Sequence, residues 1–137
     1  MSGDTRLMLG ITLVLVPTIV YGGLTVLNIV SAGAYGAAGP SISPEQATFY
    51  RAGHAHAGVL LILSLILQML IDYARIPLSL VWPARIAAPL AALLVSAGFF
   101  GTAHMGALRI VLYLGAAILM AVTVLVGIGL LRTPPGA

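Results

Sequence analysis

Long uninterrupted runs of apolar residues dominate the chain, and the polar residues fall mostly between them. Four of the runs are long enough to cross a bilayer, which needs about 20 helical residues at a rise of about 1.5 Å each. They cover residues 7–31, 53–72, 85–103 and 109–131. This pattern predicts an all-α integral membrane protein with a single domain, residues 1–137, that folds as a four-transmembrane-helix bundle.

The ends of the runs carry further local signals. The first run, residues 7–31, exceeds the roughly 7–15 residues of a signal-peptide core, so we interpret it as a membrane span. Residues 32–52 are rich in Gly, Ser and Pro and are expected to form an ordered or interfacial loop, in which Ser43–Gln46 has the pattern of a helix start. Only a few residues separate the third and fourth runs, so these two are expected to form an antiparallel hairpin.

Composition supports the membrane assignment and excludes several chemistries. Hydrophobic residues make up 61% of the chain and charged residues 7%, with a mean hydropathy of +1.14. Cysteine is absent, which excludes disulfides, thiolate metal sites, iron–sulfur clusters and covalent c-type haem attachment. The net charge of +3 comes from few residues, without a basic stripe or an aromatic platform, and so argues against a nucleic-acid partner.

The basic residues, all of them arginine, predict the orientation in the membrane. With four spans, one side carries four arginines: Arg6, Arg75, Arg85 and Arg132. The other side carries Arg51 and Arg109. Because the side richer in arginine is normally cytoplasmic, both termini are expected in the cytoplasm, with the chain in the cytoplasmic membrane of a prokaryote.

Three histidines are the candidate functional residues, and this orientation places all of them in the outer layer. His54 and His56 begin the second run in "GHAHAG", and His104 lies between the third and fourth runs. An imidazole in the apolar zone is costly unless it binds something, so it is a functional candidate; the alternative is an interfacial histidine bonded to water, headgroups or carbonyls. Successive helical residues turn by about 100°, so His54 and His56 point about 200° apart and cannot both coordinate one metal ion from one regular helix. Each therefore needs a partner from another helix or another copy of the chain.

Small residues surround this pair: Gly53, Ala55, Ala57 and Gly58. They permit the close approach of a packed helix or of a flat macrocycle, and neutral imidazole is a common axial ligand of haem iron.

Elsewhere in the runs, Pro17 and Pro89 are interpreted as kinks whose freed carbonyls are satisfied by neighbouring groups. A further set of glycines is interpreted as helix-packing surface: Gly22, Gly23, Gly98, Gly115, Gly127 and Gly129.

The "GHAHAG" at the outer end of the second span resembles the haem-ligating helices of the heme-copper oxidase catalytic subunit. In that family twelve helices form three pseudo-symmetric arcs of four, and the second helix of each arc carries metal-ligating histidines near the outer face. One of these helices has a His-x-His motif in which the two imidazole rings ligate the irons of two different haems. The resemblance implies that the present chain corresponds to one arc, with His54 and His56 as ligands and Arg109 near haem propionates. The sequence lacks the family's three-histidine copper site, so oxygen reduction is not expected.

The opposed histidines and the twelve-helix resemblance together suggest a symmetric homotrimer that imitates the oxidase subunit. Each interface would hold one b-type haem between His54 of one copy and His56 of the next, with Arg51 and Arg109 beside the propionates. The expected function is electron transfer, with a quinol or another electron donor, and no catalytic residue is assigned.

Three alternatives stay open at this point. Within one chain, His104 or Met105 could pair with a histidine of the second run. The protein could instead be a non-haem membrane subunit that acts as a scaffold. It could also be a copper or zinc carrier that uses the three histidines, although polar positions along a membrane path are sparse.

Overall fold

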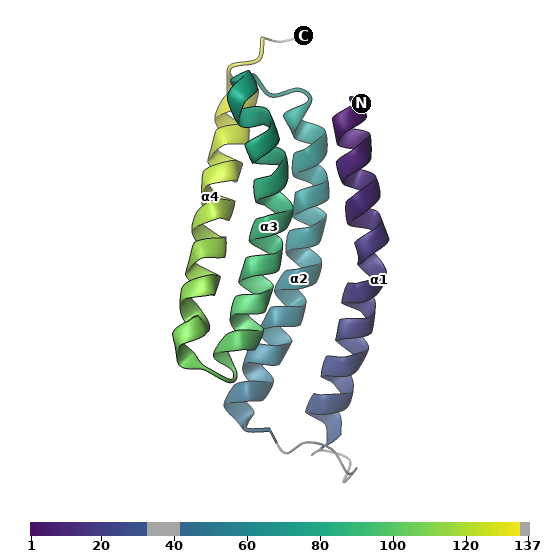
Figure 1. Ribbon diagram of the computed structural model, residues 1–137, viewed down its shortest axis with the longest axis vertical. Helices are drawn as coiled ribbons and strands as arrows, with labels where there is room; N and C mark the ends of the chain where they lie inside the picture. The colour runs from purple at the N-terminus through teal and green to yellow at the C-terminus, as the bar shows by residue number, and fades with distance from the viewer. Residues whose placement is uncertain (33–41, 135–137) are drawn as a thin grey trace.

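The computed structural model describes residues 1–32 and 42–134, and in these residues the regular structure is helical. The helices are α1 (Gly3–Ala32), α2 (Pro44–Ile71), α3 (Leu78–Thr102) and α4 (Arg109–Leu131), with one 3₁₀ turn, η1 (Gly106–Leu108), before α4 (Figure 1). All four long helices are long and apolar enough to cross a membrane. The prediction of a four-helix transmembrane bundle is confirmed.

Three helices begin earlier than the apolar runs indicated: α1 at Gly3, and α2 and α3 by a longer stretch. Helix α2 starts at Pro44 because Ser43 forms a reciprocal cap: its hydroxyl accepts the Gln46 N–H at 3.1 Å, and the Gln46 side-chain oxygen accepts the Ser43 N–H at 2.9 Å. The predicted helix start is thus confirmed, but most of the expected loop after it is helical. Residues 33–41 of that loop lie outside the described residues. Helix α3 starts at Leu78, directly after Pro77, so its first turns lie before the third apolar run, residues 85–103.

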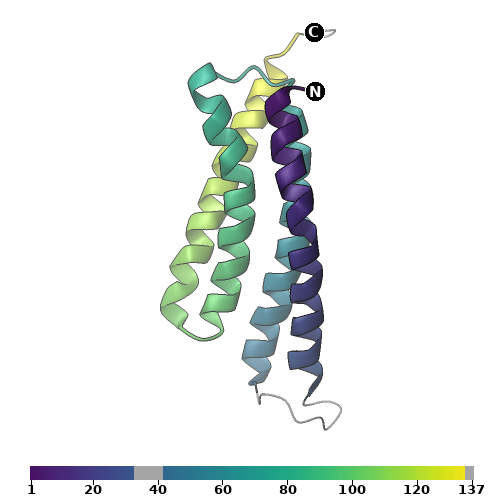
Figure 2. The ribbon, with the colours of Figure 1, turned by 45° about the vertical axis from the view of Figure 1, so that its right-hand side comes forward.

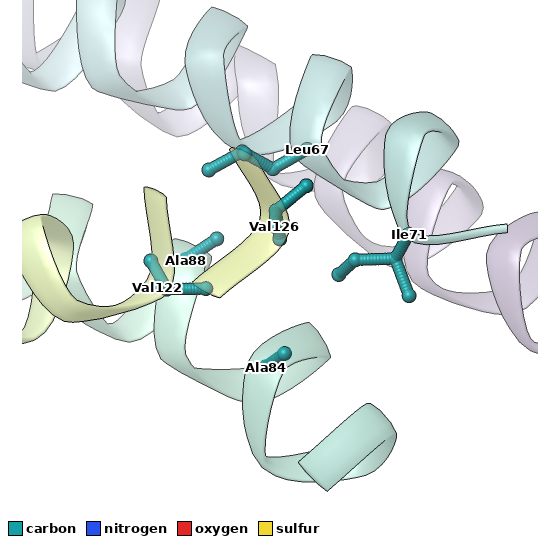
Figure 3. Packing of buried hydrophobic residues seen from close by; sticks show 6 residues of the cluster. All are labelled: Leu67, Ile71, Ala84, Ala88, Val122 and Val126. Atoms are coloured by element: carbon teal, nitrogen blue, oxygen red, sulfur yellow. The ribbon is translucent and has the colours of Figure 1, made fainter. Parts of the chain in front are cut away.

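The helices alternate in direction, and both described chain ends lie at the same end of the bundle (Figures 1 and 2). We call this the terminal end, and the opposite one, where α3 turns into α4, the hairpin end. The antiparallel α3–α4 hairpin is confirmed. The largest buried cluster joins α2, α3 and α4 (Figure 3) and contains Leu67, Ile71, Ala84, Ala88, Val122 and Val126.

Helix α1 lies at the edge of this core. It packs mainly against α2, and its only buried residues are Thr5, Thr12 and Ala32. Most of its surface is apolar and exposed, which fits contact with lipid rather than with water.

Two glycines allow α3 and α4 to approach closely. A Cβ atom on Gly98 would overlap the backbone nitrogen of Leu112, and one on Gly115 would lie 2.7 Å from the backbone nitrogen of Val95. The packing interpretation is confirmed for these two. It is confirmed also for Gly129, which faces Ala74 of the α2–α3 link at 3.0 Å.

The packing interpretation is wrong for Gly22 and Gly127 within one chain. Apart from the neighbouring residues and the backbone of its own helix, nothing lies within 4 Å of the position that a Cβ atom would take at either glycine. Both face open space at the bundle surface.

Candidate functional site

The hairpin end gathers the residues that the sequence singled out. His54 and His56 lie in the third and fourth turns of α2, His104 lies between α3 and η1, and Arg109 is the first residue of α4. Arg51 lies about one turn before His54 in α2. His54 is half-buried, and the other four side chains are exposed. The prediction that these five residues share one layer is confirmed.

His56 presents a ring nitrogen at the bundle surface. Its Nδ1 lies 2.8 Å from the Ala52 carbonyl oxygen. Because a carbonyl only accepts hydrogen bonds, Nδ1 carries a proton, and the tautomer of a neutral ring with this contact has its lone pair on Nε2. The ring also packs on Phe99, with centroids 4.7 Å apart and planes inclined by 34°. The α2 backbone and α3 thus fix the tautomer and orientation of an exposed imidazole.

His54 points in a different direction, toward α1. Its Cε1 and Nε2 atoms lie 2.6 Å from the position that a Cβ on Gly23 would take. The two histidines therefore diverge from α2, one toward α1 and one beside α3, as the helical turn between them requires. Gly23 leaves room for the ring in this orientation.

Replacing Gly23 with alanine is expected to lower the free energy of unfolding by about 1 kcal/mol, the lower end of the overpacking range, because the new methyl group meets the tip of the His54 imidazole, which can turn aside. Thermal unfolding in detergent measures the effect. Gly22→Ala is the matched control, since open space surrounds Gly22. The double variant Gly23→Ala/His54→Ala should lose less stability than the two single changes sum to, and strict additivity would contradict the contact.

His104 holds the α3–α4 hairpin to α2. Its Nε2 is hydrogen-bonded to the Tyr50 hydroxyl at 2.8 Å, and the rings meet edge-on. One turn earlier in α2, the Gln46 side-chain amide donates to the Ala103 carbonyl at 3.1 Å. Nε2 of His104 is therefore engaged by Tyr50, and the ring is held against α2 by that residue rather than by His54 or His56. The sequence reasoning assigned no role to Tyr50; its position in α2, one turn before His54, is the signal that places it in this cluster.

Arg109 lies at the edge of a small hollow between α2 and the hairpin. The hollow has a volume of about 210 Å³ and is lined by Glu45, Gln46, Phe49, Thr102, Ala103, Gly106 and Arg109. Arg51 and Arg109 are exposed at the hairpin end, where their guanidinium groups can donate to anionic groups at the membrane surface.

The histidines do not converge on a single point. Within residues 1–32 and 42–134, no three His, Asp or Glu side chains come close enough to hold one metal ion. Each histidine of α2 instead faces a different neighbour, and among the described residues hydrogen bonds engage only Nδ1 of His56 and Nε2 of His104.

The terminal end holds a second polar cluster, which the sequence reasoning missed. Arg85 of α3 is 3% exposed and forms an ion pair with Asp72 at 2.7 Å, directly after α2. The Arg85 guanidinium also donates to the Thr5 hydroxyl at 2.8 Å, and that hydroxyl donates to Asp72 at 2.7 Å. Ser2 adds its N–H at 2.8 Å and its hydroxyl at 2.7 Å to the same carboxylate. The cluster joins the start of α1 to α2 and α3.

The hydrogen bonds keep Asp72 ionised. Burial by itself would raise the pKa of the carboxyl, but the donors from the Ser2 backbone, Thr5, the Ser2 side chain and Arg85 outweigh it. The pKa of Asp72 therefore lies well below its usual range. Arg85 was counted among the arginines of one membrane side, and the structure adds that its side chain is buried against a carboxylate.

Gln68 extends the cluster and supplies the hydrogen bond that Pro89 cannot make within α3. Proline has no N–H, so Pro89 leaves the carbonyl of Arg85 without its helical donor. The side-chain amide of Gln68 donates to that carbonyl at 2.6 Å. The expectation that a neighbouring group satisfies this freed carbonyl is confirmed. Gln68 and Asp72 are four residues apart on one face of α2, and this spacing is the sequence signal that could have revealed the cluster.

No family model, curated protein or solved structure matches this chain.

Proposed function

We propose that this chain is a membrane b-type haem protein, in which neighbouring copies supply the two axial histidines of each haem and the assembly transfers electrons. The single observation that carries the proposal is the state of His56. Its Nδ1–H is bound by the Ala52 carbonyl, which leaves an exposed Nε2 with a free lone pair. Iron-ligating imidazoles have this arrangement, because the hydrogen bond fixes the tautomer and strengthens the ligand.

The divergence of the two histidines supports a site between copies. His54 faces α1 and His56 faces outward beside Phe99, so one chain does not bring both to one iron. An exposed imidazole on a membrane helix is costly in lipid, and a second copy over His56 would remove that cost. A head-to-tail contact of this kind forms a closed ring when the rotation between copies closes, and a ring of three would have the twelve helices of the resembled subunit.

The fit of the residues to haem differs between the two ligands. His56 already presents Nε2, and Phe99 supports its ring. His54 has to turn its Nε2 away from Gly23 to bind iron. Arg51 and Arg109 stand at the hairpin end, where they can donate to propionates. In the proposed orientation this end is the outer side of the membrane and both termini are cytoplasmic.

When bound, a haem with two histidine ligands supplies a one-electron iron couple with no open coordination position. The chain's own residues then have three tasks. The Ala52 carbonyl holds the proton on Nδ1 of His56, Phe99 sets the ring plane, and the arginines neutralise carboxylates near the membrane surface. This arrangement favours electron transfer, with a quinol or another reduced carrier as donor.

An absorption spectrum of the detergent-purified protein from haem-replete cells, oxidised and dithionite-reduced, tests the proposal. We expect a Soret band and sharp reduced α and β bands, which His54→Ala and His56→Ala both abolish. His104→Ala is the matched control: it removes a histidine at the same end and should keep the bands. Native mass measurement should give three chains with haem.

Three outcomes contradict the proposal. A colourless wild-type protein rejects haem, and the non-haem scaffold or the copper or zinc carrier would take its place. Bands that survive His56→Ala reject the ligand on which the proposal rests. Bands lost in His104→Ala but kept in His54→Ala reject pairing between copies in favour of pairing within one chain.

A further inference from the structure

The link between α2 and α3 lies against the end of α4, at the terminal end of the bundle (Figure 1). The Arg75 N–H donates to the Gly129 carbonyl at 3.0 Å, and the Thr133 hydroxyl donates to the Tyr73 carbonyl at 2.9 Å. Gly129 lets the link come close, since a Cβ atom there would lie 3.0 Å from the Cβ of Ala74. Hydrogen bonds and packing therefore hold together two segments that are far apart in the sequence.

This contact brings two exposed arginines to one place. Arg75 lies in the link, and Arg132 directly follows α4, three residues after Gly129. Residues three apart on a helix are neighbours on one face. The Arg132 side chain therefore begins about one helical turn from the residue that holds the Arg75 backbone. Both side chains are exposed, so both guanidinium groups can reach a ligand at this surface.

The carboxylates of the chain leave this pair of arginines uncompensated. The sequence has three acidic residues: Asp4, Glu45 and Asp72. The first lies on α1, which packs mainly against α2, the second lies at the hairpin end, and the third is paired with Arg85. Among residues 1–32 and 42–134, neither Arg75 nor Arg132 forms an ion pair. This surface therefore carries two positive charges without a matching carboxylate from the described part of the chain.

The two arginines stand where apolar surface meets polar surface. Leu78, the first residue of α3, is 92% exposed, and Leu131, the last residue of α4, is 88% exposed. Tyr73 of the link is exposed as well, and tyrosine is typical of the membrane–water interface. Arginines just beyond a span lie at the depth of the lipid phosphates. A ligand with an anionic head and apolar chains would contact both the guanidinium groups and the leucines.

We propose that Arg75 and Arg132 together bind the phosphate of one anionic phospholipid. Guanidinium groups form paired hydrogen bonds with phosphate oxygens, and two of them from different segments can hold one phosphate. A zwitterionic headgroup suits this surface less, because it brings a cation of its own to two unpaired positive charges. The bound lipid would join the end of α4 to the α2–α3 link. This site uses none of the histidines and is independent of the haem proposal.

The test compares 1-palmitoyl-2-oleoyl phosphatidylglycerol with the phosphatidylcholine that has the same chains. Protein purified in a neutral detergent is incubated with each lipid, and native mass spectrometry counts bound lipid while thermal unfolding follows stability. We expect wild type to retain one phosphatidylglycerol per chain in preference to phosphatidylcholine, with a higher Tm. Arg75→Gln and Arg132→Gln should each lower this retention about fivefold, the effect of about 1 kcal/mol for one basic residue at the membrane surface. Arg6→Gln, an exposed arginine at the same end but on α1, is the matched control and should keep it.

Several outcomes overturn the proposal. Equal retention of the two lipids by wild type excludes selection by charge. An equal loss in Arg6→Gln means that the overall charge of the terminal end attracts the lipid. Two lipids retained by wild type, one of which each variant still keeps, means two separate contacts instead of a shared phosphate.

A water-soluble phosphate separates the lipid from the headgroup alone. Glycerol 1-phosphate carries the phosphate without acyl chains and should leave the Tm unchanged at the lipid concentration. A Tm gain equal to that with phosphatidylglycerol would make a soluble phosphate compound the ligand and reject the lipid. Far-UV circular dichroism checks that the three variants keep the helix content of wild type.

Discussion

Asp72→Ala is expected to lower the free energy of unfolding by about 3–5 kcal/mol, because it leaves the Arg85 guanidinium buried without its carboxylate. Arg85 is 3% exposed, so water cannot take over the interaction. The same change removes the acceptor for Ser2 and Thr5, which hold the start of α1. Thermal or denaturant unfolding in detergent measures the loss, and α1 should become the most accessible helix to proteolysis.

Two further variants separate the buried charge from other effects. Asp4→Ala removes a carboxylate from the first turn of α1 and should cost much less, since no hydrogen bond to its side chain is present among residues 1–32 and 42–134. Arg85→Met in the Asp72→Ala background removes the uncompensated charge and should recover part of the lost stability. A double variant less stable than Asp72→Ala alone would show that hydrogen bonds to Thr5 and Gln68, rather than the charge pair, carry the effect.

The ion pair also sets the pH range in which the cluster contributes. The pKa of Asp72 is lowered in the folded protein, so its stabilisation is complete above the unfolded carboxyl pKa of about 3.9 and is lost as the pH falls below it. At neutral pH the Asp72 carboxylate at the terminal end is therefore ionised and hydrogen-bonded within the chain. At the hairpin end, by contrast, the Nε2 atom of the exposed His56 has no hydrogen-bond partner among the described residues.

Hydropathy was sufficient to find the four helices but not where they begin. A membrane span is recognised by length and composition, and both are strong here. Helix starts depend on caps instead, so α2 begins at the Ser43–Gln46 box, well before its apolar run. The start of α3 was also placed too late: the helix begins at Leu78, directly after Pro77, whereas the run was taken to begin at Arg85.

The candidate site was partly accessible to sequence reasoning. The shared layer of histidines and the divergence of His54 from His56 follow from span order and helical turn, and the structure has both. The bonds of His104 to Tyr50 and of Arg85 to Asp72 join residues far apart in the chain. No one-dimensional pattern specifies which arginine turns inward, because that depends on which acceptors the neighbouring helices place beside it.

The α3–α4 crossing is expected to be the second most sensitive part of the fold. Gly98→Leu should cost at least the upper part of the roughly 1–3 kcal/mol range for overpacking, because the first added carbon meets the backbone of Leu112 rather than a movable side chain. Gly127→Leu is the matched control in α4: no atom lies within 4 Å of its Cβ position, and leucine is the better helix former, so stability should hold or rise slightly. Unfolding in detergent compares the two. Equal stability of both variants would mean that α3 and α4 can separate at little cost, and the crossing would then not be what fixes Phe99 beside His56.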